Sequence, residues 1–225
     1  MEKARLTESS PQRRQIGHRA RKGEGGLLRE EILDAAEDLL HRHGHIEAVS
    51  VRAIAAMVGV TPPAIYLHFE DKDRLFYAVC RRGFDRFSAQ LIPALFSEGR
   101  AIERITRLGQ EYLRFGLENW QQYPMLFGAK GRLTVPGDEI ADDPGHRILH
   151  GLVALVEQAQ VDGDIRGDLT PGVVAGVLWA SVHGMVELLL GARHNPELVP
   201  IPPAEDLIPA LIETFLTGLA ATTES

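Results

Sequence analysis

The segment GVTPPAIYLHFEDKDRL, residues 59–75, carries the side chains whose types and spacing first suggest a chemical role. Two adjacent prolines, Pro62 and Pro63, open a short helical stretch. Proline lacks the backbone N–H, but the first N–H groups of a helix have no intrahelical acceptor, so this loss costs little at a helix start. The fixed φ of proline also favours the helical conformation. Behind them come an aromatic hydroxyl, an imidazole and an ammonium group: Tyr66, His68 and Lys72. What so short and stiff a helix binds depends on the elements around it.

Histidines in two places have a spacing that a metal ion can use. His146 and His150 lie four positions apart on a predicted helix, and His41, His43 and His45 alternate across a predicted helix end. Neither group has a third ligand at a suitable spacing. The sequence therefore predicts no metal site and no cofactor.

Catalytic motifs are absent from the sequence. It has no nucleophile elbow, phosphate loop, dinucleotide fingerprint or His-Glu-x-x-His pair. Ser181 and His183 are two positions apart and so point to different helix faces. The single cysteine, Cys80, reads as a small buried residue in a reducing cytosol. We expect a cytoplasmic protein that is not an enzyme.

Charge divides the 225-residue chain into two parts. The net charge is −7, but residues 1–86 have a balance of +2 and residues 87–225 a balance of −9. Residues 1–26 carry seven basic and three acidic side chains, without the apolar run of a signal peptide. A basic flexible arm is therefore predicted to precede a nearly neutral module and an acidic body.

Helical periodicity is nearly continuous and strand patterns are scarce. About nine helices are expected, at residues 27–43, 51–58, 62–69, 72–97, 101–120, 124–130, 146–161, 171–192 and 204–221. Residues 131–145, rich in Gly, Pro and Asp, are predicted to form a mobile loop. The apolar stretch 171–192 contains His183 and Glu187 and lacks a basic flank, so we interpret it as a buried helix of a protein with no membrane partner.

The spacing within residues 27–75 predicts a helix-turn-helix. Two helices of about two turns are separated by Gly59, and Ser50 and Thr61 stand where N-caps are expected. Ile54 and Ile65 supply apolar contacts, while Ala55 is small where the helices cross. Helices this short need the first and fourth helices as a platform. In such a motif the second helix is presented to the DNA major groove.

The segment VRAIAAMVGVTPPAIYLHFEDKDRLFYAV resembles the DNA-binding domain of the TetR (tetracycline repressor) family, whose recognition helix ends in Tyr-x-His/Tyr-Phe followed by lysine. Tyr66, His68, Phe69 and Lys72 carry this resemblance. It implies that Pro62, Pro63, Ala64 and Tyr66 lie at the groove, that Arg52 can reach a guanine, and that Thr61, His68 and Lys72 approach phosphates.

The predicted recognition helix has few hydrogen-bond donors for base edges. We therefore expect specificity to depend also on Arg52, on DNA shape and on the arm. Two interpretations of the arm stay open: its arginines enter a minor groove, or it is a solvated tail that adds only nonspecific attraction.

Small residues recur every four positions on the predicted eighth helix, at Gly172, Gly176, Ala180 and Gly184. Such a stripe lets another helix approach closely. The segment LWASVHGMVELLL is similar to a Trp-x-x-x-His-Gly signature of one TetR subgroup, carried by Trp179, His183 and Gly184. In that family the last two helices form the dimer interface, so the resemblance implies a homodimer.

The family resemblance also implies a small-molecule effector in the body. The candidate contacts are aromatic or soft side chains near helix ends and breaks: Trp120, Tyr123, Met125, Phe127, Trp179 and His183. Each of these residues can equally be ordinary core. The acidic body argues against an anionic ligand.

The expected protein is thus an all-α, homodimeric, sequence-specific DNA-binding regulator, a repressor released from a near-palindromic operator by a small, largely apolar ligand. Its expected domains are the arm (1–26), the helix-turn-helix domain (27–75, continuing into a connector helix, 72–97) and the ligand-binding and dimerisation domain (98–225). Alternatives are an activator, a ligand-independent regulator, or a helical binding module whose head has lost DNA binding.

Overall fold

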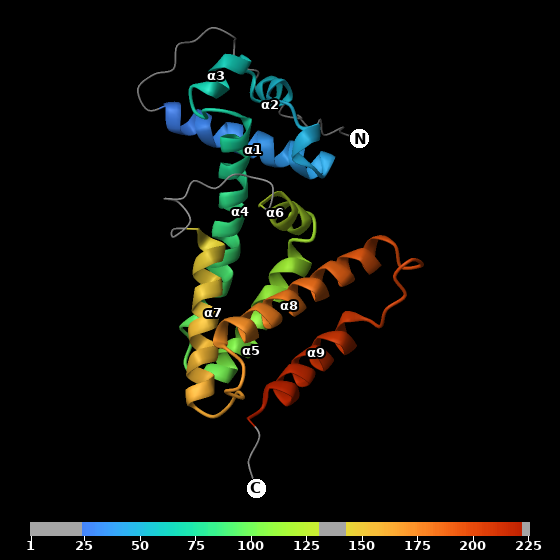
Figure 1. Ribbon diagram of the computed structural model, residues 1–225. Helices are drawn as coiled ribbons and strands as arrows, with labels where there is room; N and C mark the ends of the chain where they lie inside the picture. Colours follow the sequence, from blue (N-terminus) through green and yellow to red (C-terminus); the bar gives the residue numbers. More distant parts are fainter. Residues whose placement is uncertain (1–23, 131–142, 222–225) are drawn as a thin grey trace, which may run out of the picture. The chain divides into compact units, whose positions relative to one another are not determined.

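The computed structural model describes residues 24–130 and 143–221, which are mostly helical (Figure 1). The only extended pairing among them is one isolated bridge between Ile165 and Ala220. The described elements are α1 (Glu24–His43), η1 (Ile46–Ala48), α2 (Val51–Val58), α3 (Pro62–Tyr66), α4 (Lys72–Leu95), α5 (Ala101–Glu118), α6 (Tyr123–Lys130), α7 (Pro144–Val161), α8 (Pro171–His194) and α9 (Ala204–Leu219). The all-α prediction is confirmed.

Two predicted segments fall wholly or partly outside the described residues. Of the basic arm, residues 1–23 lie outside, and the remaining three already belong to α1. Of the predicted loop, residues 131–142 lie outside. Asp143 caps α7, because its Oδ1 accepts a hydrogen bond from the His146 backbone N–H at 3.0 Å. This cap explains why α7 begins at Pro144, before the predicted start.

The chain divides into two compact units, residues 1–76 and 77–225. We call their described parts the head and the body. Helix α4 begins in the head and continues in the body. Each unit has its own apolar core, so we describe them separately.

The head follows directly from local signals in the sequence. Gly44, with a φ of 78°, ends α1, and Gly59, with a φ of 81°, ends α2 in the left-handed conformation that glycine adopts without strain. The Ser50 hydroxyl accepts a hydrogen bond from the Ala53 N–H at 3.1 Å and caps α2 as predicted. Ile54 and Ala55 are buried where α2 meets the neighbouring helices.

The predicted end of the third helix is wrong. Helix α3 stops at Tyr66, three residues before Phe69. The Ile65 carbonyl accepts hydrogen bonds from the backbone N–H groups of both His68, at 2.9 Å, and Phe69, at 3.1 Å. The bond from His68 spans only three residues and tightens the chain into a turn at the end of the helix. Phe69 is still buried. Thr61 stands at the N-cap position of α3, but its side chain makes no capping hydrogen bond.

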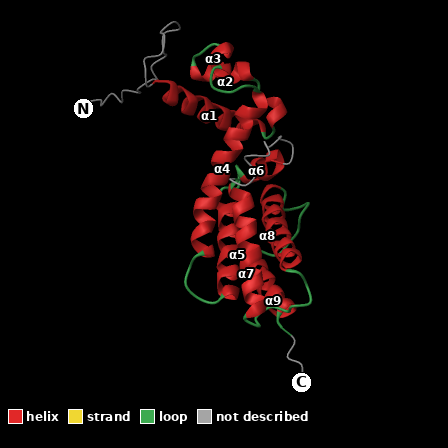
Figure 2. Cartoon of the chain, turned by 60° about the vertical axis from the view of Figure 1, so that its left-hand side comes forward, coloured by secondary structure: helices red, strands yellow, loops and turns green. Residues whose placement is uncertain are grey.

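The body is a bundle in which α5, α7 and α8 pack against one another (Figure 2). Its core contains Phe87, Leu108, Leu152 and Val186, all buried. Gly116 of α5 allows a close approach to α8, because a Cβ added there would lie 2.5 Å from a Val186 methyl group. The helix predicted at residues 101–120 is therefore a core helix of the body.

Helix α8 is buried on one face only. Val174, Ala175, Val186, Leu189 and Leu190 are buried. Val173, Val177 and Leu188 are exposed, as is Leu216 on α9. The prediction of a buried helix is thus correct for one face and wrong for the other. By length and composition α8 is apolar enough to cross a membrane, but a single such helix does not indicate a membrane protein.

Candidate functional site

The first candidate site is the exposed face of the head. Tyr66 keeps 51% of its surface accessible, and Arg52, Thr61 and Pro63 are also exposed. Pro62, Ala64, His68 and Lys72 are half-buried. Ile65 and Phe69, by contrast, are buried in the core of the head. The sequence therefore distinguished the core side chains of this segment from those that remain accessible.

The polar groups on this face are available to a partner. Within the described part of the chain, Arg52, Tyr66 and His68 make no side-chain hydrogen bond or ion pair. Lys72 also forms no ion pair with a described residue, and its Nζ lies 5.7 Å from the centroid of the Phe76 ring. Lys72 itself remains half-exposed, so its ammonium group can still reach an anion while it lies over the buried ring.

Leu67 is a residue that sequence reasoning did not single out. It is 85% exposed, the highest value among the large apolar side chains of the described residues. It follows α3 directly, beside Tyr66. The sequence contained a signal for this exposure. Ile65 and Phe69 are four positions apart and therefore face the core together, so Leu67, which lies between them, faces solvent.

The second candidate site is an aromatic cluster in the body. Phe87 of α4 lies at its centre and meets five rings edge-on at centroid distances of 5.0 to 6.3 Å. The residues predicted for the ligand site that join this cluster are Tyr123, Phe127, Trp179 and His183. Tyr112 of α5, which is not among the residues predicted for the ligand site, also belongs to it.

Three polar groups meet inside this cluster. The hydroxyls of Tyr112 and Tyr123 are 3.0 Å apart, and they lie 3.2 and 2.5 Å from His183 Nδ1. The triangle is satisfied when Tyr123 donates to Nδ1 and Tyr112 donates to the Tyr123 oxygen, which leaves the histidine proton on Nε2. Burial, together with the charge of Glu187, raises the pKa of both tyrosines, so both phenols stay neutral.

Two of the six residues predicted for the ligand site, Trp120 and Met125, are not seen in the aromatic cluster. Trp120 stands apart from the cluster, with the Arg193 guanidinium 4.6 Å above its ring and the His194 ring 5.4 Å away. Met125 lies in α6, but its side chain is outside the described residues. The four predicted residues that do meet come from α6 and α8, which are far apart in the sequence.

The body has two apolar cavities, of which the inner one adjoins the cluster. The inner cavity lies among α4, α5, α7 and α8 and opens to solvent; it comprises about 370 Å³ when its open part is included, and Tyr112 and Trp179 line it. The outer cavity lies among α5, α8 and α9 and encloses about 500 Å³, also partly open. No charged side chain lines either cavity. The body therefore has internal apolar space beside a small polar group.

The histidines considered for metal binding do not form a larger cluster. His146 and His150 have their Nε2 atoms 2.9 Å apart on α7. Among the described residues, no group of three or more His, Cys, Asp or Glu side chains is placed to hold a metal ion. Cys80 is buried, as the sequence suggested.

Comparison with known proteins gives a consistent result over both units. Residues 32–79 match the sequence model of bacterial regulatory proteins of the tetR family, and residues 105–215 match a tetracyclin repressor-like C-terminal domain. The HTH-type transcriptional regulator YobS of Bacillus subtilis is 23% identical over 86% of this chain and 93% of its own length.

Solved structures agree in fold. A protein of unknown function from Rhodococcus sp. RHA1 superposes with a TM-score of 0.69 at 30% identity, over 86% of this chain and 95% of its own. AibR, solved with isovaleryl coenzyme A and operator DNA, gives 0.65 at 20% identity over 87% of this chain and 100% of its own, a likeness of fold alone.

The two matched segments together cover more than half of the sequence and fall in the two units. They place the chain among transcriptional regulators and not among enzymes. The chain belongs to the TetR family of bacterial regulatory proteins.

Proposed function

We propose that this chain is a cytoplasmic, homodimeric repressor that binds a near-palindromic DNA operator and is released from it by a small, largely apolar ligand. The observation that carries the proposal is the face of the head, where Arg52, Tyr66 and Lys72 keep their polar groups available on a helix-turn-helix. The family match supports DNA binding and ligand response as the general activity.

The roles within the head follow from exposure and chemistry. Pro63 and Tyr66 are exposed on α3 and offer apolar surface to thymine methyl groups, and half-buried Pro62 and Ala64 flank them. Arg52 presents a guanidinium that can bind a guanine edge through two hydrogen bonds. Thr61, His68 and Lys72 contact phosphates and set the register. Leu67 adds apolar surface at the end of α3.

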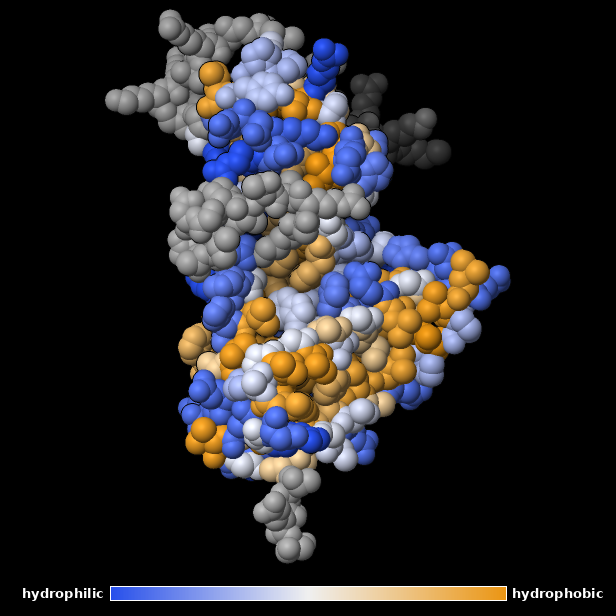
Figure 3. Space-filling view, viewed as in Figure 1, coloured by the Kyte–Doolittle hydropathy of each residue, from blue (hydrophilic) through white to orange (hydrophobic). Residues whose placement is uncertain are grey.

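The dimer forms through α8 and α9. Figure 3 shows apolar side chains gathered over these two helices. The predicted stripe of Gly172, Gly176, Ala180 and Gly184 is exposed on α8, and nothing lies within 4 Å of a Cβ added at any of its three glycines. Val173 and Val177 lie exposed beside it. A second copy that covers this face buries apolar surface and also pairs two heads for a two-fold symmetric operator.

The ligand binds beside the aromatic cluster of the body. Tyr123, Phe127, Trp179 and His183 are brought together there, next to the inner cavity. Trp179, His183 and Gly184 also support a C-terminal domain of the Trp-x-x-x-His-Gly type. Helix α4 belongs to both units, so it is the covalent route by which a change in the body reaches the head.

The test of DNA binding is the double variant Tyr66→Ala with Lys72→Ala. It removes a base contact and a phosphate contact, so operator affinity should fall by roughly 100-fold or more. The operator is first obtained by sequencing genomic fragments that the protein retains, and affinity is measured by fluorescence anisotropy. Phe96→Ala is the matched control, because Phe96 is an aromatic residue of the body that is 79% exposed.

Unchanged operator affinity in a correctly folded double variant would refute the assignment of α3 as the recognition helix. Sedimentation of the same variant separates this outcome from a loss of the dimer. Gly176→Glu tests the dimer independently, because a buried, unpaired carboxylate on the stripe should give a monomer. A dimer that persists in Gly176→Glu would place the interface elsewhere.

A further inference from the structure

The two cavities of the body share a wall. Ile105 and Gly109 of α5, and Leu178 and Val182 of α8, line both of them. Gly109 has no side chain to separate them, and a Cβ added there would still lie 3.7 Å from the nearest Val182 methyl group. The cavities therefore adjoin at this wall, which is thinnest at Gly109 and is otherwise made by the apolar side chains of Ile105, Leu178 and Val182.

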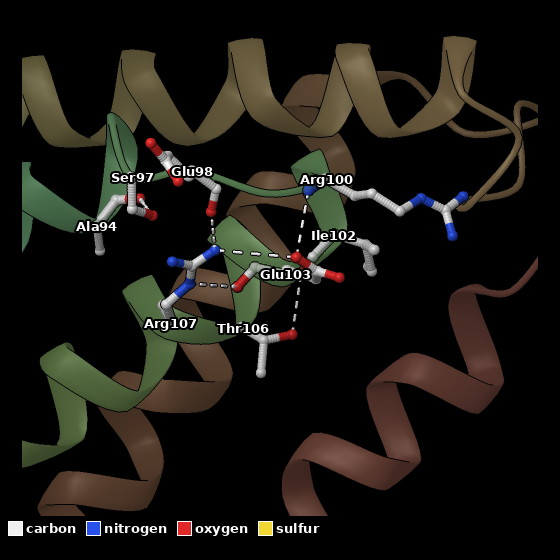
Figure 4. Close-up of polar contacts among 8 residues, drawn as sticks. All are labelled: Ala94, Ser97, Glu98, Arg100, Ile102, Glu103, Thr106 and Arg107. Atoms are coloured by element: carbon white, nitrogen blue, oxygen red, sulfur yellow. Dashed lines mark hydrogen bonds and ion pairs between the residues drawn. The ribbon is translucent and has the colours of Figure 1, made fainter.

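Polar groups are unevenly distributed along this space. In the outer cavity the one hydroxyl is that of Thr106, and it already donates to the Ile102 carbonyl at 2.9 Å (Figure 4). The rest of that lining is aliphatic or aromatic. In the inner cavity the polar side chains are Tyr112 and Trp179. The outer end can thus hold only hydrocarbon, while the inner end offers a hydrogen bond.

We propose that the two cavities form one continuous space past Gly109 and that the effector is an elongated, uncharged molecule: an alkyl chain whose tail occupies the outer cavity and whose hydroxyl group donates a hydrogen bond to the Tyr112 oxygen in the inner one. This inference rests on the proposed ligand response of the body and names its ligand class. The Tyr112 hydroxyl suits this role, because Tyr123 makes the shorter approach to His183 and satisfies its Nδ1 without Tyr112.

The ligand is uncharged because the lining holds no charge to match one. A carboxylate or phosphate buried without a cation or several hydrogen bonds is strongly disfavoured. Neither cavity is lined by Lys, Arg or His. Glu187, whose charge contributes to the raised pKa of both tyrosines, would further oppose an anion at the inner end.

The experiment measures binding to the full chain without DNA. Trp120 lines neither cavity, so in a Trp120→Phe background Trp179 is the remaining tryptophan and reports on the inner cavity. The probes are straight-chain primary alcohols of increasing length, the fatty acids of the same lengths, and one coenzyme A ester. We expect each added methylene to tighten alcohol binding about fourfold until the space is filled. The acids and the ester should bind at least tenfold more weakly.

A plug in the shared wall tests the geometry. Gly109→Leu should remove the gain for long alcohols while short ones still bind, and Gly109→Ala, whose methyl group makes only ordinary contacts, should leave the series unchanged. Val182→Phe fills the same place from α8 if Gly109→Leu does not fold. Tyr112→Phe should weaken every alcohol by a similar factor without changing the dependence on chain length.

Two results would overturn the inference: an affinity that does not depend on chain length, or acids and esters that bind as tightly as alcohols. Long alcohols that still bind the folded plug variants would refute the continuous space. Operator release is measured separately by anisotropy. If alcohols bind as expected but leave operator affinity unchanged, the proposed regulation fails and the ligand site stands. If another compound releases the operator and no alcohol binds, the reverse holds.

Discussion

The head and the body hold their candidate functional groups in opposite ways. In the head, Arg52, Tyr66 and Lys72 stand outside a small core made by other residues, Ile54 and Ile65 among them. In the body, Tyr112 and Tyr123 are both candidate ligand contacts and buried parts of the core. Binding and stability are therefore separable in the head and joined in the body.

This difference has a physical origin in what each unit binds. DNA is a large charged surface, and contacts to it need exposed donors, cations and apolar tips on a preformed scaffold. A small apolar ligand must be enclosed to bury its surface, so the residues that enclose it are those that pack the protein when the ligand is absent. Substitutions can test whether this division holds.

The largest effect is expected in the centre of the aromatic cluster. Phe87→Ala removes a fully buried ring that packs against Tyr112 and Phe115 at centroid distances of 5.1 and 5.0 Å. We expect a loss of about 3–5 kcal/mol in the free energy of unfolding. Urea unfolding followed by tryptophan fluorescence measures it, since both tryptophans are in the body.

The control for this substitution is Phe96→Ala, at an exposed phenylalanine further along the chain. Its effect should stay within about 0.5 kcal/mol. A Phe87→Ala protein as stable as this control would contradict the view that the candidate ligand site is also the core of the body.

The next largest effect concerns the crossing of α5 and α8. In Gly116→Ala the new methyl group meets Val186 at 2.5 Å from its Cγ1 and 3.2 Å from its Cβ, so the helices must move apart. We expect a loss of about 1–3 kcal/mol. Gly109→Ala on the same helix makes only a 3.7 Å contact and should gain about 0.5–1 kcal/mol from the lower flexibility of the unfolded chain.

Thermal unfolding of the two variants side by side isolates the effect of the close approach, because both replace a glycine of α5 by alanine. Equal stabilities of Gly116→Ala and Gly109→Ala would show that α8 can move away from Gly116 without a loss in the free energy of unfolding. Ligand binding by Gly109→Ala is a further check, since its added methyl group leaves the shared wall of the cavities nearly unchanged.

The sequence predicted the head better than the body because the head is built from local signals. Ser50, Gly59 and the paired apolar positions act within a few residues of where they stand. The end of α3 was missed because the apolar pair Ile65 and Phe69 fits a helix, although the chain turns after Tyr66 through the hydrogen bond from the His68 N–H to the Ile65 carbonyl. Tyr112 was missed because its partners, Tyr123 and His183, come from other helices, 11 and 71 positions away. No periodicity can report a contact of that kind.

Because Tyr112 and Tyr123 belong to both the candidate ligand site and the core, the stability of the body should depend on pH. Burial raises the pKa of Tyr123 and Tyr112 above the value near 10 that they have when unfolded. The folded state therefore keeps protons that the unfolded state loses, and stability falls as pH rises above about 10. Each tyrosine contributes a slope of up to about 1.4 kcal/mol per pH unit.

The double variant Tyr112→Phe with Tyr123→Phe removes both phenols and should flatten this fall. Urea unfolding between about pH 8.5 and 11 measures the slope for each protein. At neutral pH the double variant should be less stable by about 1–3 kcal/mol, because His183 Nδ1 loses its donor, the Tyr123 hydroxyl. The same slope in both proteins would mean that the phenols are solvated in solution.

The smallest effect distinguishes the two N-caps of the head, Ser50 and Thr61. Ser50→Ala removes the hydrogen bond to the Ala53 N–H and should lower the stability of the head by about 1 kcal/mol, which hydrogen exchange of the α2 amides can measure. Thr61 makes no such bond, so Thr61→Ala should change stability by only a few tenths. If Thr61 contacts a phosphate, its loss should instead weaken operator binding equally for all sequences and flatten the salt dependence. These two caps of one motif would then separate stability from binding, whereas in the body Tyr112 contributes to both.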